Sequence, residues 1–133
     1  MVGADIQRID ASIRAAFINE FGNALARLYA CGSLGREDFV FGWSDIDLLF
    51  VVDEITIDIL RKIRAIELTL STHHQTKVDI YAVPKLDVFN PRLAHGKLRN
   101  YAVHADRLRI LIDQLDIAFV SWDILEDVDY SHF

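Results

Sequence analysis

Cysteine and proline are scarce in this sequence. Its 133 residues include one cysteine, Cys31, and two prolines. A lone thiol excludes an internal disulfide and a cysteine-rich metal cluster, and it fits a reducing compartment. We therefore expect a cytoplasmic protein whose fold depends on packing. A hydrophobic fraction of 52% is ample for one buried core, so we expect a single domain over residues 1–133.

Long apolar runs and an excess of basic residues are also absent. The longest apolar stretch, Leu48 to Val52, is far too short to cross a bilayer, and residues 1–10 lack the basic start and apolar run of a secretory signal. We expect no membrane association. Acidic residues outnumber Lys and Arg by 20 to 14, which argues against sequence-independent nucleic-acid binding. A polyanionic ligand would need a helix N-terminus or a divalent cation to bind here.

Hydrophobic periodicity predicts alternating helices and strands. Apolar residues recur at three- and four-residue steps from Ala4 to Glu20, followed by Gly22 as a stop, and again from Ile55 to Ser71. A turn or short helix is expected from Ser33 to Phe39. Short apolar runs predict three strands, of which the second is rich in β-branched and aromatic residues: Leu25–Cys31, Ile46–Val52 and Lys77–Val83.

The C-terminal part is harder to predict. Asn90 and Pro91 are typical of a helix start, and the helix would run to about His104. The run Leu108 to Ile112 favours a strand, while Ile117 to Val120 is too short to assign. A C-terminal helix and short strand are therefore expected within residues 91–120. Together these elements predict an α/β (α+β) fold, a small mixed sheet with helices packed on one face.

Carboxylates interrupt two of the predicted strands. Asp45 and Asp47 alternate with apolar residues, so both point to one side of their strand, and Asp79 lies in the same way within a second strand. Like charges this close need a cation between them. If the strands are neighbours, the three acids form an oxygen-rich pocket suited to Mg²⁺ or Mn²⁺ rather than zinc. Two such ions stabilise both the attacking and the leaving oxygen of a phosphoryl displacement.

A glycine-containing turn precedes these acids. Gly32 allows the backbone to approach a phosphate, free N–H groups at a helix start would point toward it, and Ser33 adds a hydroxyl donor. Arg36, one helical turn onward, is placed to pair with a triphosphate. The turn and the acids together predict a site for a metal-bound nucleotide.

In this arrangement the chain resembles the nucleotidyltransferase superfamily related to DNA polymerase β. The signature is Gly-Ser, then about a dozen residues, then a strand with Asp-x-Asp, and later an acid in an apolar strand. The residues that match it lie in order within about 24–83: Gly32, Ser33, Ser44, Asp45, Asp47, Leu48 and Asp79.

The resemblance implies a role for each matched residue. Asp45 and Asp47 would hold two metal ions, and Asp79 would hold one of them and help to deprotonate the acceptor hydroxyl. A carboxylate beside the attacking oxygen is suited to accept its proton. The substrate would be an NTP, and we expect ATP. The residues that would bind it are Gly32, Ser33, Arg36 and Ser44. One position departs from the small bacterial members, which often read Gly-Ser-x-Ala-Arg-Gly, because Glu37 follows Arg36 here.

The acceptor is not defined by the sequence. Larger relatives carry a helical acceptor-binding domain, for which little chain remains after Val83. The chain thus resembles minimal nucleotidyltransferases encoded beside HEPN-type partners, some of which act as antitoxins that adenylylate a tyrosine of the partner. Two alternatives stay open: a small-molecule nucleotidyltransferase with its acceptor site at a homodimer interface, and a non-catalytic regulatory subunit.

Overall fold

The computed structural model describes residues 2–22, 25–85 and 108–114 of the chain. Most boundaries agree with the sequence-based prediction to within three residues, and the strand expected from Leu108 to Ile112 is confirmed. Along the chain the elements are α1 (Val2–Phe21), β1 (Leu25–Cys31), α2 (Gly32–Gly35), β2 (Ile46–Val52), α3 (Ile57–His74), β3 (Val78–Pro84) and β4 (Arg109–Asp113).

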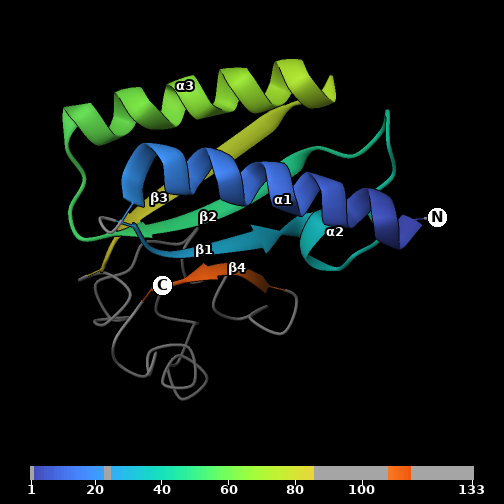
Figure 1. Cartoon of the computed structure of the whole chain (residues 1–133), viewed down its shortest axis with the longest axis horizontal. Helices are drawn as coiled ribbons and strands as arrows, with labels where there is room; N and C mark the ends of the chain where they lie inside the picture. Colours follow the sequence, from blue (N-terminus) through green and yellow to red (C-terminus); the bar gives the residue numbers. More distant parts are fainter. Residues whose placement is uncertain (1, 23–24, 86–107, 115–133) are drawn as a thin grey trace, which may run out of the picture.

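Four of these elements form a mixed sheet in the order β3-β2-β1-β4. β1 is antiparallel to both β2 and β4, whereas β2 and β3 are parallel. A parallel pair needs a long crossover, and α3 supplies it. Figure 1 shows α1 and α3 on the same side of the sheet. The predicted mixed sheet with helices packed on one face is therefore confirmed.

The main core lies between the two long helices and the sheet. α1 contributes Ile13 and Phe17, β2 contributes Leu48 and Phe50, and α3 contributes Ile66. The rings of Phe17 and Phe50 meet edge to face with centroids 5.0 Å apart, a favourable aromatic geometry. Residues of the opposite alternation form a second buried cluster on the other face: Ala26, Tyr29, Cys31, Leu49, Val51 and Val83. Asp47 shares this alternation, so the acids lie on the face opposite the helices.

The ends of α3 are set by its flanking residues. The Thr56 hydroxyl accepts a hydrogen bond from the Ile59 N–H at 3.1 Å, which caps the helix two residues later than predicted. At the other end Gln75 takes a left-handed conformation and ends the helix at His74, three residues past Ser71. His73 and His74 occupy the last turn.

Some expectations fall on parts of the chain that the structure does not describe. The helix expected from Asn90 to about His104 and the run Ile117 to Val120 lie outside the described residues, and a single domain over 1–133 stays a prediction. In the described segments, no helix combines the length and apolar character needed to span a membrane.

α1 and α3 are joined by a polar contact between Ser12 and His74. The Ser12 Oγ lies 2.6 Å from the His74 Nε2 and donates to the Ile9 carbonyl oxygen at 2.9 Å, so the hydroxyl oxygen is placed to accept from the imidazole. Burial, and then the neighbouring charge of His73, lower the pKa of His74 from its ordinary value of 6.5. The folded chain therefore favours neutral His74.

Because the pKa of His74 is lower in the folded than in the unfolded chain, the neutral ring contributes stability at neutral pH. That contribution is lost as the pH falls below about 6.5. We expect the Tm of His74→Gln to fall less than that of the wild type between about pH 7.5 and pH 5.5 in thermal denaturation. His73→Gln is the matched control and should keep most of the wild-type pH dependence, since burial is the larger cause. Identical pH profiles for His74→Gln and the wild type would contradict this.

Candidate active site

Two of the three predicted acids are direct neighbours across the sheet. Asp47 on β2 pairs in register with Asp79 on the parallel strand β3. Adjacent strands lie about 4.8 Å apart, and paired residues project from the same face. Asp47 is half-buried and Asp79 is exposed. The fold therefore brings these carboxylates together at the start of both strands, as the sequence predicted if β2 and β3 were neighbours.

Asp45 lies just outside this pair. It immediately precedes β2, is exposed, and stands two residues before Asp47. The backbone here is tied to the segment that leads into β3: the Ile46 N–H donates to the Lys77 carbonyl at 2.9 Å, and the Thr76 hydroxyl donates to the Ser44 carbonyl at 2.7 Å. The backbone at Asp45 is thus fixed next to the first residues of β2 and β3.

The chemistry of these side chains fits a hard divalent cation, because every candidate ligand is a carboxylate oxygen. Within the described ranges no three His, Cys, Asp or Glu side chains are arranged as a ready metal site. Mg²⁺ is usually held by one or two carboxylates together with substrate phosphates rather than by a complete protein cage. Asp47 and Asp79 fit that mode, and the participation of Asp45 stays a prediction.

The Gly-Ser turn packs directly against Asp47. β1 ends at Cys31, which is the register partner of Asp47 on β2, and α2 begins at Gly32. Gly32 has a φ of +55°, and a Cβ built there would lie 3.0 Å from the Asp47 Oδ2. A side chain at this position would therefore be strained and would displace the carboxylate. Ser33, which is half-buried, follows at once.

Two predicted nucleotide-binding residues have partners within their own loop. The Arg36 Nε lies 3.2 Å from the Asp38 Oδ2, with 44% of the Arg36 side chain exposed. The Ser44 hydroxyl accepts the Val40 N–H at 2.9 Å. Ser44 thus stabilises the loop between α2 and β2, and its contact with a nucleotide, like that of Arg36, stays a prediction.

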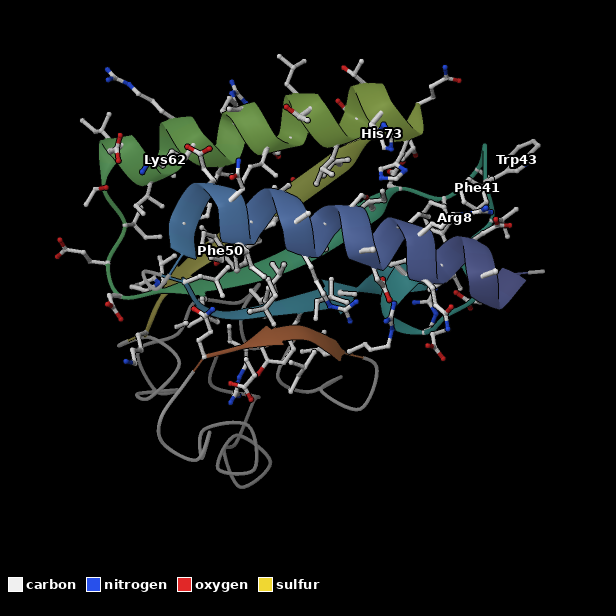
Figure 2. The ribbon with its side chains drawn as sticks, in the orientation of Figure 1. Arg8, Phe41, Trp43, Phe50, Lys62 and His73 are labelled. Atoms are coloured by element: carbon white, nitrogen blue, oxygen red, sulfur yellow. The ribbon has the colours of Figure 1, made fainter. Side chains whose placement is uncertain are left out.

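Aromatic side chains lie exposed in the same loop. Trp43 is 88% exposed and Phe41 is 50% exposed, and Figure 2 shows both at the outer end of the loop between α2 and β2. The Phe41 ring meets Phe39 edge to face with centroids 5.3 Å apart. Trp43 lies two residues before Asp45 in the sequence, and its exposed ring is accessible to a ligand or partner.

Family comparison agrees with this geometry. The family model of the nucleotidyltransferase domain matches residues 12–103, a span that includes the Gly-Ser turn and all three acids. The chain belongs to this family. The predicted resemblance to the nucleotidyltransferases related to DNA polymerase β is confirmed. Members of this group typically use divalent metal ions. Among curated proteins, none matches the sequence.

Solved structures with the same nucleotidyltransferase fold come from toxin-antitoxin pairs. A complex of tri-AMPylated Shewanella oneidensis HEPN toxin with MNT antitoxin aligns at a TM-score of 0.54 and 17% identity, over 81% of this chain and 72% of that chain. A toxin-antitoxin structure with AMP-PNP aligns at a TM-score of 0.57 and 16% identity, over 87% and 79% respectively. At these identities the comparison establishes the fold.

The sequence did not identify an ion pair that contacts the segment after the Gly-Ser motif. Asp10 is 4% exposed, and it pairs with Arg109 across 99 positions of sequence. The only hint in the sequence was an acid beside the apolar stripe of α1. Glu37 has a φ of +63°, which explains why glycine is common there in the small bacterial relatives.

Gly32→Ala should damage the site beyond the cost of backbone strain. A left-handed conformation costs a residue with a Cβ about 1 to 2 kcal/mol, and here the methyl group also meets Asp47. Gly42→Ala is the matched control, because Gly42 has a φ of +83° and a Cβ added there would meet no atom within 4 Å. In thermal denaturation and Mg·ATP calorimetry, both variants should lose stability while Gly32→Ala alone loses nucleotide affinity. Equal affinities would show that the turn does not support Asp47.

Proposed function

We propose that this nucleotidyltransferase transfers AMP from ATP to a hydroxyl group on a partner protein. The main support is the register pair of Asp47 and Asp79 with Gly32 packed against Asp47. The paired acids and the glycine turn lie at one end of three adjacent strands, β1, β2 and β3. Such a site suits a substrate that carries both phosphates and a divalent cation.

The proposed reaction forms a bond between the acceptor oxygen and the α-phosphorus of ATP. The bond from that phosphorus to the bridging oxygen breaks, and pyrophosphate leaves. Asp79, exposed at the start of β3, would accept the proton of the attacking hydroxyl. Gly32 and Ser33 would receive the phosphates, and Arg36 would exchange Asp38 for a phosphate oxygen.

Asp45, Asp47 and Asp79 would hold Mg²⁺ or Mn²⁺. The bound ions supply charge stabilisation to the attacking and leaving oxygens. Without them the triphosphate would meet carboxylates of the same charge sign, which repel it. Nucleotide binding is therefore expected to depend on the cation.

The structural neighbours suggest the class of acceptor. One is an MNT antitoxin in a complex whose HEPN toxin carries AMP groups, and another contains AMP-PNP. We extend this to a HEPN-type partner with an acceptor tyrosine for the present chain. The homodimeric small-molecule enzyme and the regulatory subunit remain the alternatives.

Label transfer from α-labelled ATP distinguishes these functions. When the wild type is incubated with α-labelled ATP, Mg²⁺ and the product of the neighbouring gene, that product should become labelled. EDTA should abolish both the labelling and the binding of ATP measured by calorimetry. Label on a small metabolite would support the alternative enzyme. Tight Mg·ATP binding without transfer to any acceptor would retire the catalytic proposal.

Substitution of single acids tests the assigned roles. Asp47→Asn keeps the size of the side chain but removes a charge, so turnover should fall by roughly two to four orders of magnitude while the fold survives. Asp53→Asn is the matched control, since this exposed acid follows the other end of β2 and pairs with Lys85 at 3.6 Å. Near-normal turnover in Asp47→Asn would refute the assignment.

Asp79→Asn should separate chemistry from binding. Asp45 and Asp47 would still hold the nucleotide-bound cation, whereas the acceptor hydroxyl would lose its base. We expect the Kd for Mg·ATP to change by less than about tenfold and turnover to fall by about a hundredfold or more. A loss of affinity as large as the loss of turnover would remove the proton-acceptor role.

A further inference from the structure

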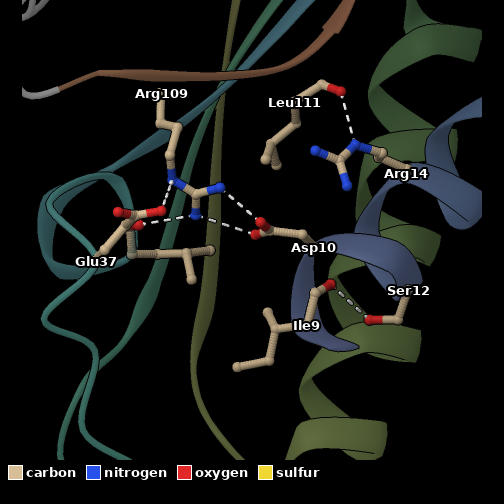
Figure 3. Close-up of polar contacts among 8 residues, drawn as sticks. Ile9, Asp10, Ser12, Arg14, Glu37, Arg109 and Leu111 are labelled. Carbon is tan, nitrogen blue, oxygen red and sulfur yellow. Dashed lines mark hydrogen bonds and ion pairs between the residues drawn. The ribbon is translucent and has the colours of Figure 1, made fainter. Parts of the chain in front are cut away.

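An ion pair between α1 and β4 reaches the turn that follows β1. The Arg109 Nη1 and Nη2 donate to the two carboxylate oxygens of Asp10, and the Nη2 bond to the Asp10 Oδ1 measures 3.1 Å. The same Nη2 donates to the Leu34 carbonyl of α2 at 3.0 Å. One guanidinium therefore connects three segments that are far apart in sequence (Figure 3).

Arg109 also faces the strained residue of the turn. The Glu37 Oε1 lies 3.6 Å from the Arg109 Nε, an atom that is buried and has no hydrogen-bond partner among the described residues. Glu37 itself has a φ of +63°, which a residue with a Cβ adopts at a cost. The positive charge of Arg109 thus favours the carboxylate at the place where the backbone is strained.

The backbone of this turn is closed by three hydrogen bonds. The N–H groups of Arg36, Glu37 and Asp38 donate to the carbonyls of Gly32, Leu34 and Ser33, at 3.0, 3.2 and 3.0 Å. Leu34 is fully buried, so its carbonyl is a fixed point beneath the turn. Arg109 binds that fixed point from β4, next to the segment that approaches Asp47.

The anchors of Arg109 are rigid. Asp10 lies on α1 and is 4% exposed. Arg109 lies on β4, where its backbone pairs with Ala30 near the end of β1. Arg14, one turn after Asp10 on α1, donates its Nε to the Leu111 carbonyl at 2.8 Å and ties the same helix to the same strand. A bidentate arginine between such anchors constrains position and orientation, which a lysine cannot do.

We propose that Asp10 and Arg109 are positioning residues that hold the Gly32–Asp38 turn in its nucleotide-binding conformation. Neither is expected to touch the nucleotide. They act through Leu34 and Glu37, so that the turn stays beside Asp47 before a nucleotide arrives. The consequence for nucleotide binding rests on the proposed function, whereas the hold on the turn can be tested without it.

Arg109→Lys is the test variant and Arg27→Lys its matched control. Arg27 is buried, forms a bidentate pair between β1 and β4 with Asp113, and donates to the Tyr29 hydroxyl at 3.0 Å. Within the described ranges, none of these contacts involves α2 or the turn. Each variant thus removes a bidentate arginine–carboxylate pair that involves β4, but only Arg109→Lys also removes a bond to the turn.

Amide hydrogen exchange of the apo protein measures the turn directly. In Arg109→Lys the amides of Arg36, Glu37 and Asp38 should exchange about tenfold faster relative to the sheet amides, and in Arg27→Lys their relative rates should match the wild type. Equal turn protection in the two variants would overturn the proposal. If Arg109→Lys does not fold, Asp10→Asn, which keeps the shape but removes the charge, gives the same comparison.

Nucleotide kinetics test the consequence. Arg109→Lys should raise the KM for Mg·ATP by about tenfold with kcat within about threefold of wild type, while Arg27→Lys changes neither. A loosened turn with unchanged KM would overturn its role in nucleotide binding. If the wild type bound no Mg·ATP, the proposed function would fail, and hydrogen exchange would still decide whether the pair holds the turn.

Discussion

Two carboxylates of like charge, Asp47 and Asp79, stand opposite each other on neighbouring parallel strands, and the described fold is arranged to keep them there. Parallel pairing needs the α3 crossover, and α1 and α3 cover the opposite face of the sheet. The antiparallel strand β1 ends beside Asp47, so that Gly32 lies next to the Asp47 carboxylate. Proximity that is unfavourable in an empty site becomes useful when a cation and a triphosphate share it.

Local patterns predicted the elements of this fold but not how they pair. The apolar periodicity of α1 and α3, the apolar run of β1 and the β-branched runs of β2 and β3 are short-range signals, so their bounds were close to those observed. The Thr56 cap and the left-handed Gln75 shifted α3 by two or three residues. Strand order, the parallel register of β2 with β3 and the Ser12 contact with His74 depend on residues far apart in sequence, which one sequence cannot relate.

For the candidate site, too, local motifs could be predicted from the sequence but long-range contacts could not. Alternation placed Asp47 and Asp79 each on one face of its own strand, and the Gly-Ser motif located the turn. That the two strands are neighbours is known only from the fold. No local pattern could reveal that Gly32 touches Asp47 or that Arg109 joins Asp10 to Leu34. Ser44 and Arg36, chosen as nucleotide ligands from the motif, have partners inside their loop, because loop residues also satisfy the backbone that carries them.

The proposed function requires that Asp45, Asp47 and the glycine turn bind one metal-bound nucleotide. Anomalous diffraction from crystals grown with Mn²⁺ and a non-hydrolysable ATP analogue tests it most directly. We expect a manganese peak about 2 Å from carboxylate oxygens of Asp45 and Asp47, with the phosphates beside Gly32 and Ser33. A nucleotide ordered elsewhere on the chain, or ordered at the turn with no metal between phosphates and carboxylates, would contradict it.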